Sequence, residues 1–122
     1  MKRSLFYTFI LFMSLNFSLA NMNAPENNSE EVRVSWYGGK FHGRLTASGE
    51  VYNMNDFTAA HKKLPFGTKV RITNIRNNKS VIVTINDRGP FVGSRKFDLS
   101  KAAFHEIASA GRGVITATYE IL

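Results

Sequence analysis

Two β-branched runs on either side of a short polar turn constrain the fold of this chain more than any other feature. Residues 69–75 and 79–85 are rich in Val, Ile and Thr, and they are separated by Arg76-Asn77-Asn78. β-Branched side chains favour strands, and Asn favours tight turns. The pattern therefore predicts an antiparallel hairpin.

Two further runs predict the strands that flank this hairpin. Residues 32–37 alternate apolar and polar side chains and end at Gly38-Gly39, and residues 114–122 form a last β-branched run. No internal repeat is visible. A chain with several short strands and glycine-rich connections is expected to close its sheet, because closure removes exposed edges. We therefore expect an all-β fold, a small closed barrel.

One short helix is expected among these strands, between residues 99 and 110. Asp98 or Ser100 is the candidate N-cap, and Gly111 is the expected stop. The apolar residues that fall on one helical face are Leu99, Ala102, Ala103, Ile107 and Ala110.

The N-terminal segment has the composition of an export signal. Lys2 and Arg3 precede an uncharged stretch, which ends at Ser18-Leu19-Ala20 with small residues at the two positions that a signal peptidase reads. We expect a signal peptide over residues 1–20, and hence a periplasmic, envelope or secreted protein. An uncleaved anchor is the alternative, although so short a stretch barely crosses a bilayer core of about 30 Å.

The remaining chain divides into a linker and one domain. Residues 21–31 are rich in Asn and Glu with almost nothing to bury, so we expect a flexible linker there and a domain over residues 32–122. That domain carries 14 of the 16 Lys and Arg residues but 6 of the 9 Asp and Glu residues. In an exported protein this surplus favours an acidic polymer as partner over nucleic acid, for which no base-reading motif is present.

The residue types present exclude several kinds of chemistry. There is no Cys, which excludes disulfides, a thiolate zinc site and a cysteine nucleophile. Neither a Gly-x-Ser-x-Gly elbow nor a phosphate-binding loop occurs. A metal site built from His42, His61 and an Asp is conceivable, but the spacing of these residues is not that of a metal motif, so we expect no metal and no cofactor.

Polar, glycine-rich stretches at 35–43, 46–50 and 86–90 are the candidate functional segments, and each has a structural alternative. Asp87 is able to hydrogen-bond turn amides, and Asp98 is more typical of an N-cap than of a catalyst. Trp36 and Tyr37 fit either the core or a platform on which a sugar ring stacks.

These segments occur in an order that resembles the rare lipoprotein A family over essentially the whole domain. The resemblance implies a six-stranded double-psi β-barrel, a fold shared with expansins and some endoglucanases, and lytic transglycosylase activity on peptidoglycan. The motifs are Val34-Ser35-Trp36-Tyr37-Gly38, Phe41-His42-Gly43, Thr46-Ala47-Ser48-Gly49-Glu50, Leu64-Pro65-Phe66-Gly67-Thr68, residues 70–74, Asn86-Asp87-Arg88-Gly89-Pro90-Phe91 and Asp98-Leu99-Ser100.

The resemblance also implies roles for individual residues. Asp87 matches the catalytic acid, and His61 and Glu50 match its active-site companions. The side chains expected to bind the sugar rings are Trp36, Tyr37, Thr46, Ser48 and Arg88. Many family members also have a lipidated cysteine and a second, glycan-binding domain; we expect neither here, and so no stable membrane anchor after signal cleavage.

Three activities are compatible with these residues. A lytic transglycosylase uses one carboxyl, which protonates the leaving sugar oxygen and then accepts the proton of the muramyl C6 hydroxyl as that hydroxyl attacks C1. A hydrolase uses Asp87 and Glu50 as a carboxylate pair with water. An expansin-like module binds the polysaccharide without breaking bonds.

Overall fold

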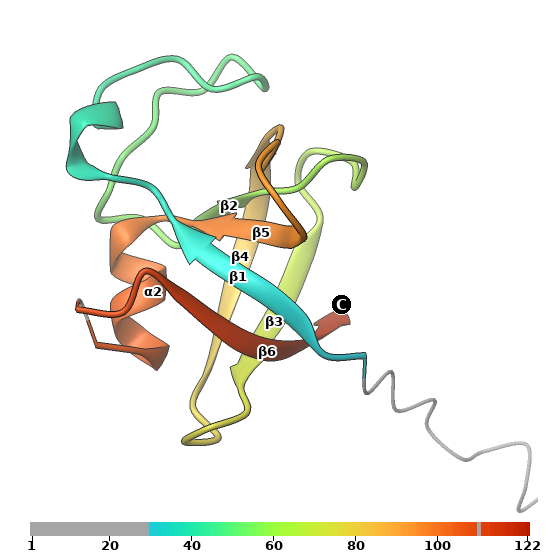
Figure 1. Ribbon diagram of the computed structural model, residues 1–122. Helices are drawn as coiled ribbons and strands as arrows, with labels where there is room; N and C mark the ends of the chain where they lie inside the picture. The colour runs from blue at the N-terminus through green and yellow to red at the C-terminus, as the bar shows by residue number, and fades with distance from the viewer. Residues whose placement is uncertain (1–29, 110) are drawn as a thin grey trace, which may run out of the picture.

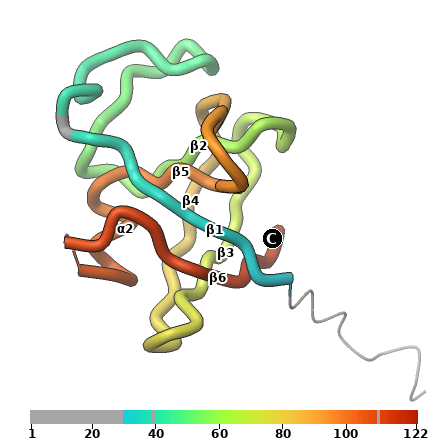
Figure 2. Tube along the Cα trace, in the orientation of Figure 1, coloured from blue at the N-terminus to red at the C-terminus, as the bar shows by residue number. Residues whose placement is uncertain are grey.

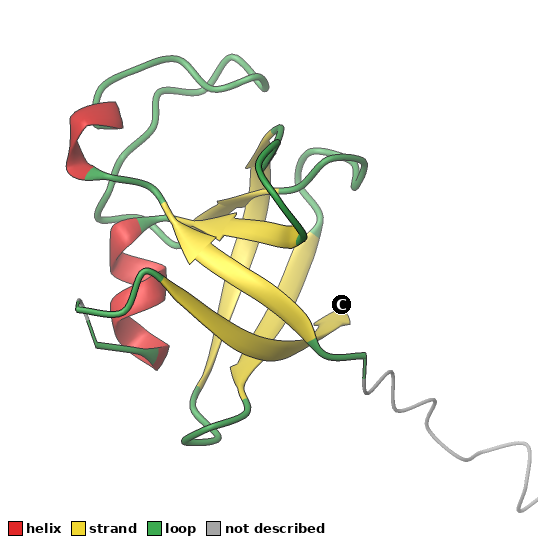
Figure 3. Ribbon diagram, viewed as in Figure 1, coloured by secondary structure: helices red, strands yellow, loops and turns green. Residues whose placement is uncertain are grey.

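Six strands close into a barrel in the computed structural model, which describes residues 30–109 and 111–122. The strands follow the order β1-β5-β2-β4-β3-β6 around the barrel. Figure 3 shows these strands, with a helix packed beside them and loops at both ends. The predicted all-β closed barrel of six strands is therefore confirmed. The predicted signal peptide and most of the predicted linker lie outside the described residues. The elements are β1 (Val32–Trp36), the 3-10 helix η1 (Gly39–Phe41), β2 (Thr58–Ala60), β3 (Lys69–Asn74), β4 (Ser80–Asp87), β5 (Arg95–Leu99), α2 (Lys101–Ile107) and β6 (Val114–Ile121).

The predicted hairpin is the pair β3 and β4. Val70 pairs with Val83 and Ile72 with Val81, and all four side chains are buried. Asn78 has a φ of 62° in the turn, in the left-handed region that Asn tolerates better than most residues. The local pattern thus sets both the strands and the turn between them.

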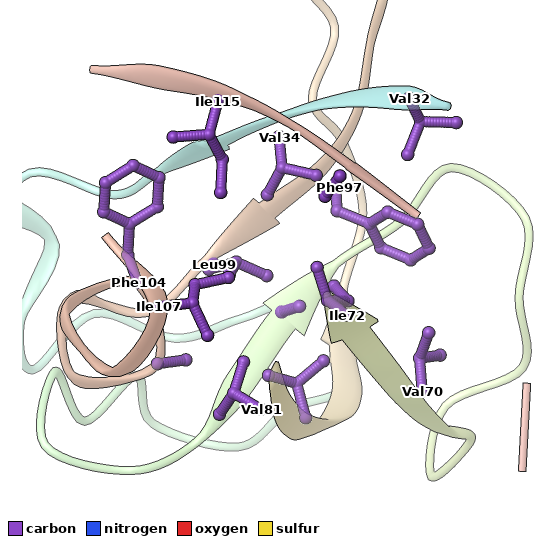
Figure 4. Close-up of a cluster of buried hydrophobic side chains, with 14 of the residues drawn as sticks. Val32, Val34, Val70, Ile72, Val81, Phe97, Leu99, Phe104, Ile107 and Ile115 are labelled. Carbon is purple, nitrogen blue, oxygen red and sulfur yellow. The ribbon is translucent and has the colours of Figure 1, made fainter. Parts of the chain in front are cut away.

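The barrel interior and the inner face of α2 form one apolar core (Figure 4). Alternate residues of the long strands point inward, so Val34, Ile72 and Leu99 are fully buried. α2 adds Phe104 and Ile107, which are also fully buried.

The helix is shorter than predicted, and one residue expected in it belongs to a strand. Leu99 ends β5, and the helix begins after Ser100, whose Oγ accepts a hydrogen bond from the Ala103 N–H at 3.3 Å. The last helical residue is Ile107, so the expected stop at Gly111 is wrong. The Ile107 carbonyl accepts hydrogen bonds from the side-chain amides of Asn74 and Asn77, at 2.7 and 3.0 Å. Ala110, predicted on the helical face, lies outside the described residues.

Long connections gather at one end of the barrel, which we call the loop end (residues 37–57, 61–68 and 88–94). Figures 1 and 2 show them above the strands, with the β3–β4 turn at the opposite end. No helix among the described residues is long and apolar enough to cross a lipid bilayer.

Candidate active site

Strand pairing places two carboxyl groups in one row at the loop end. Ser35 of β1 pairs with Asp98 of β5, Asp98 pairs with Ala60 of β2, and Ala60 pairs with Asp87 of β4. Directly paired residues point to the same face of a sheet. The Ser35 hydroxyl accordingly donates to Asp98 Oδ1 at 3.0 Å. Asp87 and Asp98 thus flank the small side chain of Ala60.

A β-bulge brings Asp87 to the barrel mouth. Ile85 pairs with Ala59 and Asp87 with Ala60, so β4 has one extra residue, Asn86, relative to β2. Strict alternation along β4 would place Asp87 on the buried side, in phase with Ile85. The extra residue changes that phase, because Asn86 is buried and Asp87 is only half-buried. Asp87 therefore reaches the surface at the end of a buried strand.

Three donors hold the Asp87 carboxyl in one orientation. The Tyr37 hydroxyl donates to Oδ2 at 2.9 Å, and the Ala47 and Arg88 N–H groups donate to Oδ1 at 2.9 and 2.8 Å. Burial, followed by the charge of Asp87 and this hydrogen bond, raises the pKa of the Tyr37 phenol. Tyr37 therefore keeps its proton at neutral pH and remains a donor to Asp87.

His61 is joined to Asp87 through the backbone and is fixed in one tautomer. The backbone N–H of His61 donates to the backbone carbonyl of Asp87 at 3.2 Å. The ring Nδ1 of His61 accepts from the backbone N–H groups of Lys63 and Leu64, both at 3.0 Å. Burial, with the positive charges of Lys96, Arg88 and Lys62, lowers the pKa of the imidazole. The ring is thus neutral at pH 7, with its proton on Nε2 as a hydrogen-bond donor.

Residues 46–50 form a tight turn that docks on the end of β4. The backbone N–H of Glu50 donates to the Ser48 hydroxyl, and the hydroxyls of Ser48 and Thr46 are hydrogen-bonded to each other. The Thr46 hydroxyl also donates to the Glu50 carbonyl. Gly49 has a φ of +89°, which side-chain-bearing residues rarely adopt. The Ser48 N–H also donates to the Asn86 carbonyl at 3.2 Å. Within residues 30–109 and 111–122 no hydrogen bond or ion pair holds the exposed Glu50 carboxyl.

Two of the predicted sugar-binding side chains have structural contacts instead. Trp36 packs on Phe104 and His105 of α2, with ring centroids 6.1 and 5.8 Å apart. Arg88 Nη1 donates to the carbonyls of His61 and Leu64, at 3.3 and 2.9 Å, and its guanidinium lies over the Phe66 ring. Tyr37 is therefore the aromatic side chain in contact with Asp87, while a sugar contact by Trp36 or Arg88 stays a prediction.

Asp98 is a site residue that the sequence alone did not reveal. Burial raises the pKa of this carboxyl, against the hydrogen bond from Ser35 and the charge of Arg95, and the nearby charge of Asp87 raises it further. Asp98 and Ser100 were the two candidate N-caps, but Ser100 caps the helix and Asp98 lies within β5. The alternation of Phe97, Asp98 and Leu99 was the signal of a strand in which this carboxyl and the apolar residues face opposite sides.

The buried charge of Asp98 predicts a pH-dependent stability. Between the ordinary pKa of an Asp and the raised value, the folded protein keeps a proton that the unfolded chain releases, so stability falls as pH rises through this window. Asp98→Asn removes that charge and retains an acceptor for Ser35. We expect its melting temperature to exceed that of the unmodified protein by a few degrees at about pH 8 and by less at about pH 4. A difference between the two proteins that does not change with pH would contradict this assignment.

A surface cavity at the other end of the barrel does not compete with this site. It has a volume of about 620 Å³ and extends beside the β3–β4 turn and the start of β6, and it is lined by neither a carboxyl nor an imidazole. Among residues 30–109 and 111–122, no group of three or more His, Cys, Asp or Glu side chains is placed to hold a metal ion. His42 Nδ1 instead accepts the Met54 N–H at 3.1 Å.

Comparison with known proteins decides the family. The sequence model of a family described as lytic transglycolase matches residues 29–119. The chain belongs to this family. It is 60% identical over 93 residues to an endolytic peptidoglycan transglycosylase RlpA of Neisseria meningitidis, a match that covers 73% of this chain and 39% of the relative. The Vibrio cholerae protein of the same name is 46% identical over 98 residues, with 80% of this chain and 37% of the relative covered.

These matches confirm the resemblance to the rare lipoprotein A family. The chain spans less than two fifths of the length of the two relatives. Two solved structures share the fold. A Streptomyces papain inhibitor has a TM-score of 0.62 at 20% identity, covering 79% of this chain and 97% of that protein. An expansin of Clavibacter michiganensis has a TM-score of 0.61 at 17% identity, covering 75% of this chain and 49% of that protein.

Proposed function

We propose that this protein is an endolytic lytic transglycosylase, which cleaves the β-1,4 bond between N-acetylmuramic acid and N-acetylglucosamine in peptidoglycan. The product strands would end in 1,6-anhydro-N-acetylmuramic acid. The observation that carries the proposal is the oriented carboxyl of Asp87, on a strand whose end is hydrogen-bonded to the backbone of His61, in a domain that is 60% identical to a peptidoglycan transglycosylase.

Asp87 would act first as an acid and then as a base. It gives a proton to the oxygen between the two sugars, and the bond from that oxygen to C1 of the muramyl residue breaks. The C6 hydroxyl of the same residue then attacks C1 and loses its proton to Asp87, so the anhydro ring closes without water. Tyr37 stays protonated throughout and holds Asp87 in place.

His61 and Glu50 would assist Asp87 by contacting the substrate. His61 follows β2 and offers Nε2–H to a sugar oxygen, because its Nδ1 is already occupied by two backbone donors. Glu50 is exposed in the turn that contacts Asp87 through Ala47, so its carboxyl is available to a sugar hydroxyl. In this proposal both residues contact substrate, and Asp87 alone exchanges protons with it.

Mass spectrometry of the products tests the proposed reaction against its alternatives. Purified peptidoglycan is incubated with the protein, and the new ends are analysed. We expect anhydro ends. Reducing ends would identify a hydrolase with a carboxylate pair, and binding without any new ends would identify an expansin-like module.

Binding to the cell wall should depend on ionic strength. Residues 32–122 carry 14 Lys and Arg residues but 6 Asp and Glu residues. Attraction between such a surface and an anionic polymer is screened within about 10 Å at 0.1 M salt and about 3 Å at 1 M. We expect retention on peptidoglycan to fall across this range in a sedimentation assay. Equal retention would mean that stacking and hydrogen bonds supply the affinity.

We also propose that the protein is exported, with a signal peptide over residues 1–20, a linker over 21–31 and the catalytic domain over 32–122. The basic residues at positions 2 and 3, the uncharged stretch and Ala20 support this division. The mass of the protein recovered from the cell envelope tests it, because cleavage after Ala20 leaves Asn21 as the first residue.

A further inference from the structure

A second cavity, of about 330 Å³, opens beside His61. Its walls come from the segment after β2 and from the residues that lead into and begin β5. The Nδ1 of His61 faces its own backbone turn, while the imidazole contributes to the cavity wall. The six lining residues are His61, Lys62, Lys63, Ser94, Arg95 and Lys96.

Four of these six residues are cations, and no carboxyl lines the cavity. Lys96 lies 3.8 Å from the carboxylate of Glu30, and both side chains are partly exposed. Arg95 Nε donates to the Val92 carbonyl at 3.3 Å, and the positive charge of Arg95 also acts on the Asp98 carboxyl. Within residues 30–109 and 111–122, Lys62 and Lys63 form no ion pair. Among the described residues the cavity therefore holds a surplus of positive charge, to which Lys62 and Lys63 contribute without a paired carboxylate.

The electrostatic effect of this cluster is visible on His61. The charges that act on its imidazole come from Lys96, Arg88 and Lys62, all positive, and they lower its pKa together with burial. The arrangement costs stability through repulsion among like charges. An anion in the cavity would relieve that repulsion while contacting a residue of the candidate active site.

We propose that this cavity binds a carboxylate carried by the muramyl residue next to the bond that is cleaved. The inference rests on the proposed function and names the substrate group that this side of the site recognises. His61, which lines the cavity, donates its backbone N–H to the Asp87 carbonyl, so the cavity opens beside the end of the strand that carries Asp87. Muramic acid carries a lactyl ether, and N-acetylglucosamine does not. A cationic cavity at this place would therefore set which sugar of the alternating strand occupies the cleaved position.

Two forms of peptidoglycan supply such a carboxylate. A strand stripped of its peptides has the free lactyl carboxylate, and a strand with peptides has acidic side chains and a C-terminus on the stem. Both present the same chemistry to lysine and arginine side chains. The experiment therefore includes both forms.

The test measures equilibrium binding of soluble glycan fragments to the Asp87→Asn variant, in which turnover does not interfere. Three fragments are compared: stripped glycan, the same glycan with its lactyl carboxylates converted to methylamides, and glycan with stem peptides. The cavity variant carries Lys62→Gln and Lys63→Gln in addition to Asp87→Asn. The matched control adds Arg76→Gln and Lys79→Gln, which remove two exposed charges at the opposite end of the barrel.

We expect the cavity variant to bind at least one of the two carboxylate-bearing fragments about three- to tenfold more weakly than the Asp87→Asn protein does. The affinity of the control variant should fall by less than about twofold. The methylamide should bind both proteins equally. A larger loss on stripped glycan would identify the lactyl carboxylate as the ligand, and a larger loss on glycan with peptides would identify the stem. Equal losses for the acid and the methylamide, or for cavity and control variants, would overturn the proposal.

Failure of the proposed function would be seen separately. Unmodified protein that binds these fragments with the expected carboxylate dependence but forms no anhydro ends would remove the transglycosylase and leave the cavity assignment in place. Formation of anhydro ends, together with binding that does not depend on the carboxylate, would remove the cavity assignment and leave the transglycosylase in place.

Discussion

Asp87→Asn should abolish the formation of anhydro ends while the domain remains folded. An amide keeps the shape of the carboxyl: its oxygen still accepts the Ala47 and Arg88 N–H groups, and its NH2 group donates to the Tyr37 oxygen. The amide does not exchange the proton that the leaving oxygen requires. General acid–base groups contribute about 10²- to 10⁴-fold to a rate, so we expect a loss of this size in kcat. Glycan binding should change little, because the sugar-binding surface stays in place. Product formation and thermal melting are measured on the same preparation.

A matched substitution separates this effect from the loss of any exposed carboxylate. Asp56 is exposed in the loop before β2, and Asp56→Asn should leave turnover within about twofold of the unmodified protein. Near-normal activity of Asp87→Asn with a large loss in Asp98→Asn would assign the acid to Asp98, whose raised pKa suits a proton donor. Unfolding of Asp87→Asn would mean that the carboxyl serves the three hydrogen bonds rather than the reaction.

Phe104→Ala should produce the largest loss of stability among single substitutions in α2. Phe104 is fully buried between the barrel and Trp36, and its removal leaves a cavity in the core (Figure 4). Truncation of a buried Phe costs about 3–5 kcal/mol, which is a large part of the 5–15 kcal/mol that is typical for a domain. Urea unfolding followed by Trp36 fluorescence measures the loss, because the indole lies against the substituted ring.

The control for this substitution is the same change at an exposed position. Phe91 is 78% exposed at the loop end, so Phe91→Ala should shift the free energy of unfolding by less than about 0.5 kcal/mol. Similar losses for both variants would show that α2 contributes little to the core. If Phe104→Ala does not fold, Phe104→Leu takes its place in the test, with an expected loss of about 1–2 kcal/mol in the free energy of unfolding.

Local patterns were sufficient to predict the features whose causes lie within a few residues. The β3–β4 hairpin follows from β-branched runs around an Asn-containing turn, and the start of α2 follows from a Ser that caps the next N–H groups. The family was also recognisable, because several of its motifs occur along this chain in the family's order, among them Asn86-Asp87-Arg88-Gly89-Pro90. Asp87 and His61 were found this way, although neither spacing nor composition shows that they are neighbours.

The remaining features depend on strands that are far apart in the chain, and they follow from how those strands pair. β2 has three residues, too few for a period, and it exists because β4 and β5 pair with it on both sides. The same pairing buries Asp98 and aligns it with Asp87, and the extra residue in β4 turns Asp87 out of the core. Trp36 and Arg88 were equally undetermined, since contacts with α2 and with the segment after β2 occupy their side chains. The physical reason is that burial, pKa and the direction of a side chain are set by neighbours tens of residues away, and a local pattern contains no information about them.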